Sequence, residues 1–210
     1  MTTKFSIAKR VTKFLDKIHV DAYQENESSL HADITRDMVK RLSESPYWPG
    51  YGAKVLDVGC GRGYALGAFK NHGCSPMGLT ISEKDAWLCR EKGFMVQVED
   101  MTFTSFWDET FDIIWARHCL EHSPWPLLTL FEFNRLMKVG GLLYAEMPAP
   151  DTACYHECNE NHYSVLLPRN WHTLLDRAGF RRVEHFHLNT QTQVGPDKYY
   201  VFICQKEADV

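Results

Sequence analysis

The sequence predicts a doubly wound α/β fold, with a mostly parallel sheet of about seven strands, helices on both faces and a C-terminal antiparallel hairpin. From residue 55 onward, short apolar runs alternate with segments of helical periodicity, which is the pattern of βα units joined by right-handed crossovers. The last two apolar runs, Phe180–Leu188 and Tyr199–Gln205, are separated only by a polar connection that contains Gly195 and Pro196. This spacing favours an antiparallel pair of strands at the end of the sheet.

The length and composition predict one domain with an N-terminal appendage. A chain of 210 residues with 44% hydrophobic residues can bury one sizeable core and leaves little room for a second. We therefore expect an N-terminal helical cap at residues 1–50 and a single globular unit at residues 51–210. The chain contains no internal repeat.

Charge and cysteine content limit the environment and the partners. The formal net charge of −4 and the pI of about 6.2 argue against a broad nucleic-acid footprint. No run of the sequence approaches the ~20 apolar residues of a membrane span, so we expect no stable membrane insertion. Basic residues interrupt the N-terminal segment, whereas a secretory signal needs an apolar core there. Seven cysteines at irregular spacing are typical of reduced thiols, which predicts a cytoplasmic protein.

The first 50 residues contain two helical patterns separated by a polar stretch. Residues 5–19 place apolar side chains at helical spacing with basic residues on other faces, which predicts an amphipathic helix. We favour a helix packed on the domain; a membrane-surface or organelle-targeting helix is the alternative. Residues 21–29 are polar and are expected to form a linker, and residues 34–42 are expected to form a second helix that ends before Pro46.

A succession of strand and helix signals then follows. The predicted parallel strands are Val55–Val58, Met77–Ile81, Phe94–Val98, Phe111–Ala116 and Leu142–Met147. The predicted helices cover residues 64–71, 83–92, 125–138 and 168–178. Gly140 and Gly141 are expected to end the third of these helices, because glycine readily adopts the left-handed conformation of a helix C-terminus.

The regular alternation breaks between residues 148 and 167. This stretch holds prolines, acids, histidines and cysteines without periodicity, and such a long loop inside a compact domain is usually functional. Cys154, Cys158 and His162, with His156 as a fourth donor, are ligand types that zinc accepts, but ten residues would have to wrap tightly around one ion. We therefore predict no metal and interpret the loop as a polar lid over a substrate, with a plain surface loop as the alternative.

Asp57 lies at the carboxyl end of the first predicted strand, and Gly59, Gly61 and Gly63 follow the strand. Glycine has no Cβ, so backbone amides here can approach a ligand closely, and ligands of open α/β sheets bind outside the carboxyl ends of the strands. A dinucleotide-binding loop needs Gly-x-Gly-x-x-Gly, which would place the third glycine at position 64, and a P-loop needs Gly-Lys-Ser/Thr. Neither pattern is present, which weakens both nucleotide-phosphate interpretations.

Five segments in the same order resemble the class I S-adenosylmethionine-dependent methyltransferase superfamily. They are Asp57-x-Gly59-x-Gly61-x-Gly63, Val98-Glu99-Asp100-Met101, Phe111-Asp112-Ile113-Ile114, Leu120-Glu121-His122 and the run from Arg135 to Leu142. The last two are similar to the small-molecule branch that contains quinone-biosynthesis methyltransferases. The resemblance covers about residues 53–205 and implies a Rossmann-like domain that binds S-adenosylmethionine.

The resemblance also implies which residues contact this cofactor. The glycine loop would border its amino-acid and ribose end, Asp100 would accept from the adenine amine, and the residues after strand four would border the methyl group. The cofactor-binding residues expected in this way are Asp57, Gly59, Cys60, Gly61, Gly63, Thr80, Ile81, Asp100, Met101, Arg117 and His118. The superfamily commonly ends strand two with an acid that accepts from both ribose hydroxyls; Thr80 stands here instead, which leaves the ribose contact open.

Methyl transfer from a sulfonium is an in-line displacement, so the protein chiefly positions the acceptor and removes a proton where the acceptor must lose one. Histidine suits that second task at neutral pH. His118 lies next to the end of strand four, His122 belongs to the Leu-Glu-His segment and His162 belongs to the predicted lid. These three are the candidate catalytic residues, with a structural, hydrogen-bonded role as the alternative for each.

We therefore predict an S-adenosylmethionine-dependent methyltransferase that acts on a small-molecule acceptor, with oxygen as the favoured atom. A protein or nucleic-acid methyltransferase and a cofactor-binding protein without turnover are the alternatives. The tetrapeptide after strand four, Ala116-Arg117-His118-Cys119, is not the Asn-Pro-Pro-Tyr type of motif that binds a flipped base, which counts against nucleic acid. A homodimer is compatible with the sequence.

Overall fold

The computed structural model describes residues 4–20 and 29–207. The predicted linker at residues 21–29 lies, except for its last residue, outside the described residues. In the described part of the chain, no helix combines the length and the apolar character that crossing a bilayer requires.

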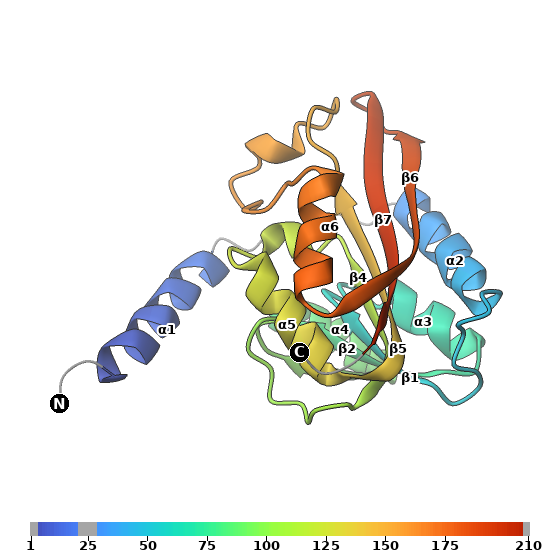
Figure 1. The fold of residues 1–210 in the computed structure, drawn as a ribbon, viewed down its shortest axis with the longest axis horizontal. Helices are drawn as coiled ribbons and strands as arrows, with labels where there is room; N and C mark the ends of the chain where they lie inside the picture. Colours follow the sequence, from blue (N-terminus) through green and yellow to red (C-terminus); the bar gives the residue numbers. More distant parts are fainter. Residues whose placement is uncertain (1–3, 21–28, 208–210) are drawn as a thin grey trace.

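One seven-stranded sheet forms the centre of the molecule (Figure 1). Its strands are β1 (Lys54–Val58), β2 (Ser75–Thr80), β3 (Met95–Val98), β4 (Phe111–Arg117), β5 (Met137–Pro148), β6 (Phe180–Gln191) and β7 (Pro196–Lys206). They lie in the order β3-β2-β1-β4-β5-β7-β6. All neighbours from β3 to β5 are parallel, whereas β7 is antiparallel to both β5 and β6, so the predicted fold and its C-terminal hairpin are confirmed.

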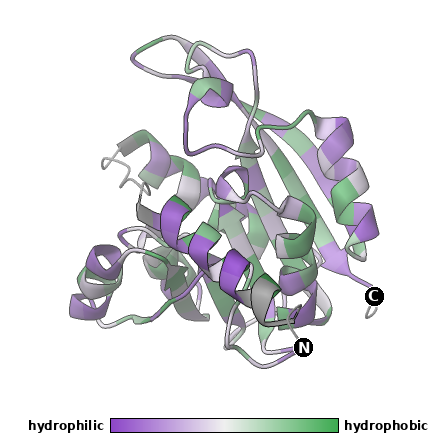
Figure 2. Ribbon diagram, turned by 90° about the vertical axis from the view of Figure 1, so that its left-hand side faces the viewer, coloured by the Kyte–Doolittle hydropathy of each residue, from purple (hydrophilic) through white to green (hydrophobic). Residues whose placement is uncertain are grey.

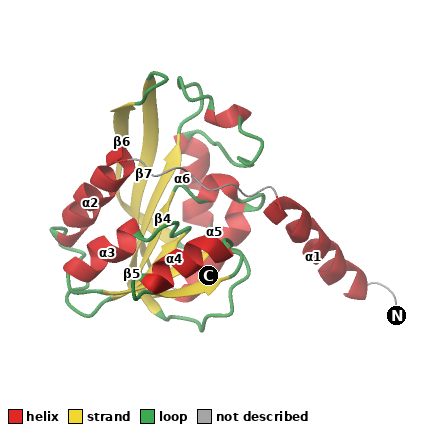
Figure 3. Ribbon diagram, turned by 180° about the vertical axis from the view of Figure 1, so that it is seen from behind, coloured by secondary structure: helices red, strands yellow, loops and turns green. Residues whose placement is uncertain are grey.

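Helices cover both faces of this sheet (Figure 3). The covering helices are α2 (Ser29–Ser43), α3 (Tyr64–Asn71), α4 (Glu83–Glu91), α5 (Pro126–Leu136) and α6 (Pro168–Arg177). The described chain also contains helix α1 (Lys4–Val20) and the short 3₁₀ turns η1 (Leu120–His122) and η2 (His156–Cys158). Local chemistry starts several of them: the Ser82 hydroxyl caps α4 by accepting from the Asp85 amide, and Pro126 and Pro168 begin α5 and α6.

The core has two main layers because successive side chains of a strand point to opposite faces. Val55 and Ile113 face α2 and α3, where Phe69 is fully buried, while their neighbours Leu56 and Ile114 face α5 and α6. A smaller cluster packs α4 beside α3 next to β3. Figure 2 shows the same distribution, with hydrophobic residues concentrated on the strands and hydrophilic stretches along the outer helix surfaces.

The N-terminal helices differ in how they contact the sheet. Helix α2 belongs to the core, since Val39 and Leu42 are fully buried against α3 and the strands. Helix α1 extends away from the body (Figures 1 and 3) and contacts it through Phe14, whose ring lies 5.0 Å from that of Trp125, and through its C-terminal turn. Ile7 remains 63% exposed, so the apolar face of α1 is only partly covered.

The junction between α5 and β5 corrects one sequence prediction. The helix ends at Leu136, two residues before the predicted boundary, and β5 begins at Met137 instead of Leu142. Gly140 and Gly141 therefore lie within β5, in an irregular segment that pairs Met137 with Phe111 and Leu142 with Ile113. Helical periodicity could not reveal this, because the pairing with β4 decides where the helix stops.

Replacing Gly141 by alanine is expected to lower the free energy of unfolding by about 1–3 kcal/mol. A Cβ at this position would lie 2.9 Å from the Lys138 carbonyl oxygen and 3.0 Å from that of Asp112, and neither backbone atom can move aside easily. Gly67→Ala is the matched control, because nothing lies within 4 Å of its added Cβ and alanine favours a helix by about 0.5–1 kcal/mol. Urea unfolding of both variants and of the parent protein measures the change. If Gly141→Ala were as stable as the parent, the close approach of the added Cβ to the two carbonyl oxygens would have no energetic cost.

Candidate functional site

A cavity of about 470 Å³ opens at the carboxyl ends of β1, β2 and β4. This is the switch point of the sheet, where the chain runs outward from β1 to β3 on one side and continues with β4 on the other. Eleven of the predicted site residues line it: Asp57, Gly59, Cys60, Gly61, Thr80, Ile81, Asp100, Met101, Arg117, His118 and His122. The size is typical of a pocket for a cofactor or small molecule.

The glycine loop forms one wall of the cavity. Gly59 has a φ of 69°, and a Cβ there would come within 3.0 Å of the Cys119 Cβ, so this position requires glycine. The amides of Gly59 and Cys60 both donate to the Leu79 carbonyl oxygen, which holds the turn against the end of β2. Gly63, with a φ of 83°, does not line the cavity; it precedes the first residue of α3.

Asp57 brings a buried carboxyl group to this wall. The residue is only 3% exposed, and among the described residues its Oδ2 atom has no hydrogen-bond partner. Burial raises the pKa of Asp57 well above its ordinary value, and the charge of Arg117 offsets this only in part. Buried polar atoms are normally hydrogen-bonded, so Asp57 is suited to a cationic or hydrogen-bond-donating ligand.

The residues after β2 and β3 form the opposite wall. The Thr80 hydroxyl already accepts from the Ser82 amide, 3.1 Å away. Asp100 accepts from the Thr102 amide through Oδ1, and its Oδ2 lies 2.9 Å from Nε2 of His19 on α1. Helix α1 therefore reaches the carboxylate for which the sequence predicts an adenine contact.

A buried ionic cluster lies behind the end of β4. The Glu146 carboxylate, 0% exposed, lies 2.9 Å from both Arg117 Nε and His118 Nε2, and it accepts from the Tyr144 hydroxyl at 2.6 Å. Burial alone would raise the pKa of Glu146, but the hydrogen bond from His118 and the charge of Arg117 lower it to about 2.

His118 is held in an unusual backbone conformation beside this cluster. Its φ is 53°, a region that residues other than glycine seldom adopt, and its amide donates to the Glu146 carbonyl oxygen. Such conformations persist where surrounding contacts impose them, and they concentrate at functional sites. The His118 ring lines the cavity and contacts Tyr199, 4.5 Å between centroids.

His122 and His162 come together although 40 residues separate them. Their ring centroids lie 4.8 Å apart, and His122 Nδ1 contacts the Asn161 carbonyl oxygen. His122 lines the cavity together with Asn161 and Tyr163, whereas His162 lies just behind this wall.

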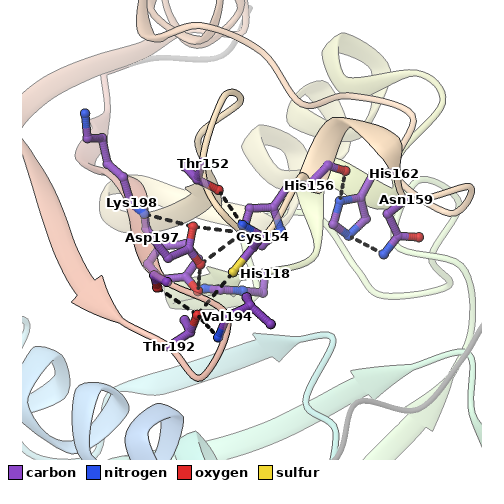
Figure 4. Close-up of polar contacts among 12 residues, drawn as sticks. His118, Thr152, Cys154, His156, Asn159, His162, Thr192, Val194, Asp197 and Lys198 are labelled. Carbon is purple, nitrogen blue, oxygen red and sulfur yellow. Dashed lines mark hydrogen bonds and ion pairs between the residues drawn. The ribbon is translucent and has the colours of Figure 1, made fainter.

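Cys154 and His156, in the loop between β5 and α6, form a second cluster with residues of the β6–β7 hairpin (Figure 4). Nε2 of His156 lies 3.0 Å from Asp197, which also accepts from the Tyr199 hydroxyl, and Cys154 Sγ lies 3.5 Å from the Thr192 hydroxyl. Cys158 is exposed and belongs to neither group of candidate ligands. The zinc arrangement weighed from the sequence, with Cys158 beside Cys154 and His162, is therefore not assembled.

Sequence reasoning missed several residues of the cavity. Ile18 and His19 of α1 and His31 and Thr35 of α2 line it, and their segments carry no motif. Glu146 could have been found, because an acid within a continuous apolar strand is costly to bury unless it has a specific partner.

The family follows from a comparison with known sequences. A model of a methyltransferase domain matches residues 23–191. This chain belongs to that methyltransferase family. The match begins within the predicted N-terminal cap, in agreement with the burial of α2.

Curated relatives of this methyltransferase differ in the atom that they methylate. A ubiquinone biosynthesis O-methyltransferase of Pseudomonas aeruginosa is 29% identical over 58% of this chain and 56% of its own length. A sarcosine/dimethylglycine N-methyltransferase of Aphanothece halophytica is 25% identical over 80% of this chain and 62% of its own length. The chain thus spans less than two thirds of these relatives.

Solved structures confirm the fold. A putative methyltransferase of Bacillus halodurans superposes with a TM-score of 0.67 at 18% identity, covering 82% of this chain and 99% of the other. An S-adenosylmethionine-dependent methyltransferase of Archaeoglobus fulgidus gives a TM-score of 0.66 at 20% identity over 83% of this chain and 94% of the other.

The cavity fits S-adenosylmethionine, the cofactor that the resemblance of the sequence implies and on which the Archaeoglobus fulgidus methyltransferase depends. The unpartnered Asp57 carboxylate suits its ammonium group, the glycine wall permits close approach, and Asp100 beside the thioether of Met101 suits the adenine. When bound, the cofactor supplies a methyl group on a positively charged sulfur. The individual contacts remain predictions.

Proposed function

We propose that this methyltransferase transfers the methyl group to an oxygen atom of a small-molecule acceptor. The observation that carries the proposal is the His118–Glu146 pair at the edge of the cofactor cavity. A hydroxyl must lose its proton to become a good nucleophile, whereas a neutral amine attacks before it loses one. A base fixed beside the methyl group is therefore more useful for an oxygen acceptor.

The hydrogen bonding of His118 suits it to that role. A carboxylate with a pKa of about 2 only accepts at neutral pH, so the His118 Nε2 that contacts Glu146 carries a proton. In the neutral ring, Nδ1 then holds the lone pair. Glu146 also stabilises the imidazolium that forms when His118 takes a proton, which is how a buried carboxylate assists a histidine base.

The boundaries of the cavity support a small acceptor. Residues from α1, α2 and the loop after β5 line it, including His19, His31 and Tyr163. These segments would cover the methyl group and exclude water during transfer. The O-methyltransferase name of the Pseudomonas aeruginosa relative agrees with this choice, while the N-methyltransferase relative represents the competing chemistry.

Competition between acceptor classes tests the proposal. The enzyme would be incubated with methyl-labelled S-adenosylmethionine and a mixture of hydroxylated aromatics, secondary amines, transfer RNA and protein. Label is expected on the hydroxylated small molecules, and the His118→Gln variant should lose that label. Label confined to amines, RNA or protein would overturn the proposal.

A further inference from the structure

Two cysteines meet at the glycine wall of the cavity. Cys60 belongs to the glycine loop and lines the cavity, while Cys89 lies on α4, is fully buried and packs in the same small cluster. The Gly61 carbonyl oxygen is 3.9 Å from Sγ of Cys60 and 3.3 Å from Sγ of Cys89. Two different elements therefore direct their thiols to one backbone atom, and both cysteines are free thiols.

Two glycines provide the space for these sulfur atoms. A Cβ added to Gly78 of β2 would lie 2.7 Å from Sγ of Cys60, and a Cβ added to Gly63 would lie 3.0 Å from Sγ of Cys89. A larger residue at either position would displace a sulfur atom, because protein interiors are closely packed. The pair is thus enclosed by the protein, and the cavity gives access to Cys60.

A hydrogen bond between the two thiols makes them chemically unequal. It raises the pKa of Cys60, which burial raises further, and it lowers the pKa of Cys89. Burial opposes the lower pKa of Cys89, whereas the charge of Lys92 supports it. The negative charge of a thiolate is therefore favoured on Cys89, next to the protonated thiol of Cys60.

Methyl transfer as proposed above uses neither thiol. The glycine loop is expected to approach the cofactor through its backbone, and Cys89 lies behind that loop. A single buried cysteine is usually inert. A second thiol in contact changes this, because it can react with a sulfenic acid that forms on the first and so complete a disulfide.

We propose that a hydroperoxide that enters the cavity converts Cys60 and Cys89 into a reversible disulfide, and that this bond lowers the affinity for S-adenosylmethionine. The oxidant would be as small as hydrogen peroxide, because it has to reach Cys60 through the cavity. The proposal does not depend on which atom of the acceptor is methylated.

The oxidation takes two steps. The Cys60 sulfur attacks one oxygen of hydrogen peroxide while its proton passes to the Cys89 thiolate; the O–O bond breaks, which gives a sulfenic acid on Cys60 and a hydroxide ion. The Cys89 sulfur then attacks the sulfenic sulfur, and the hydroxyl group leaves as water with the Cys89 proton. The two sulfur atoms lose two electrons in total and the peroxide gains them. A thiol reductant reverses the change by thiol–disulfide exchange.

The new bond would act on the cofactor through the glycine loop. The amides of Gly59 and Cys60 donate to the Leu79 carbonyl oxygen and hold the loop against the end of β2. A disulfide requires its sulfur atoms to come closer than two separate thiols do, so it would pull Cys60 towards α4 and away from this position. The coupling is reciprocal, and bound cofactor should therefore slow the oxidation.

Peptide mapping tests whether the bond forms. The full-length protein would be treated with hydrogen peroxide, freed of it, alkylated with N-ethylmaleimide and digested with trypsin without reductant. Trypsin cleaves after lysine and arginine, so Cys60 is the single cysteine of the peptide 55–62 and Cys89 that of the peptide 85–90. We expect a linked pair of these peptides that dithiothreitol separates, and slower formation of this pair with saturating S-adenosylhomocysteine.

Calorimetry with S-adenosylhomocysteine measures the consequence. The oxidised parent protein is expected to bind about tenfold more weakly or worse, and dithiothreitol should restore the affinity. Cys89→Ser should bind like the reduced parent and should keep that affinity after peroxide treatment. Cys204→Ser, which replaces a fully buried thiol on β7, is the matched control and should lose affinity on oxidation as the parent does. Thermal unfolding under reducing conditions checks that both variants are folded.

Three results would each overturn the proposal or one part of it. If the parent gave no linked pair, or a link from Cys60 to another cysteine, the site would be wrong. A linked pair with unchanged affinity would refute the effect on the cofactor. A loss of affinity that persists in oxidised Cys89→Ser would mean that oxidation elsewhere causes it.

Discussion

Replacing Asp57 by asparagine is expected to weaken the binding of S-adenosylhomocysteine by about tenfold to a hundredfold, which corresponds to the loss of a hydrogen bond to a charged group. The carboxylate is buried at the end of β1, and its Oδ2 has no hydrogen-bond partner in the part of the chain that the structure describes. A bound ammonium group would supply one. Isothermal titration calorimetry measures the change, and unchanged affinity would contradict the assignment of Asp57 to the cofactor.

The same substitution is expected to raise the stability of the ligand-free protein. Because burial raises the pKa of Asp57, the fold favours the neutral carboxyl form over the charged form. The stabilising contribution of the neutral form is fully present below pH 3.8, the ordinary pKa, and it is lost as the pH rises through the raised pKa. Asparagine removes this penalty, so the advantage of Asp57→Asn in Tm should grow with pH over that range. Asp33→Asn, an exposed carboxylate paired with Arg36 on α2, is the control and should change neither affinity nor this trend.

Replacing His118 by glutamine is expected to lower kcat by about 10²–10⁴-fold, the usual contribution of a positioned general base. The effect on S-adenosylhomocysteine affinity should be much smaller, since glutamine retains a similar shape and a donor for Glu146. Single-turnover kinetics with labelled cofactor would separate the two effects. Equal losses in binding and turnover would indicate that His118 holds the cofactor instead.

Glu146→Gln tests whether the Glu146 carboxylate assists His118 as the base. Its carboxylate has a pKa of about 2 in the fold and an ordinary value of 4.5, so its stabilising contribution is present above pH 4.5 and is lost as pH falls towards 2. The difference corresponds to a contribution on the order of 3 kcal/mol at neutral pH. We expect the variant to be less stable at pH 7, as urea unfolding measures, because Arg117 and His118 lose their carboxylate partner. If His118 is the base, single-turnover kinetics should also show a lower kcat, because the imidazolium that forms during transfer is no longer stabilised.

The alternation of strands and helices was predictable because each element carries its own periodicity and its own end signals. The strand that carries Asp57 near its end and the glycine turn are local features, and the structure places them at the predicted edge of the sheet. The α5–β5 junction was not predictable, because pairing with β4 overrides the helical pattern of Met137 and Lys138.

The part of the cavity formed by α2, the end of β4 and the loop after β5 depends on contacts between distant parts of the chain. Arg117 meets His31 across 86 positions, His118 meets Glu146 across 28, and His122 meets the loop at Asn161 across 39. No periodicity or spacing links such residues. His118 and His122 were predicted as candidates, but His31 and the other partners were not.

The sequence by itself therefore determined the fold class and one wall of the cavity, because a buried strand, a glycine turn and a carboxylate near the strand end are set by residues that are close together in the chain. Only the tertiary structure decided which carboxylates and histidines share a site, since burial and hydrogen bonding set their charge and orientation. Glu121, His122 and His162 show this most directly, because folding alone brings one polar side-chain atom of each within 4.8 Å of those of the other two.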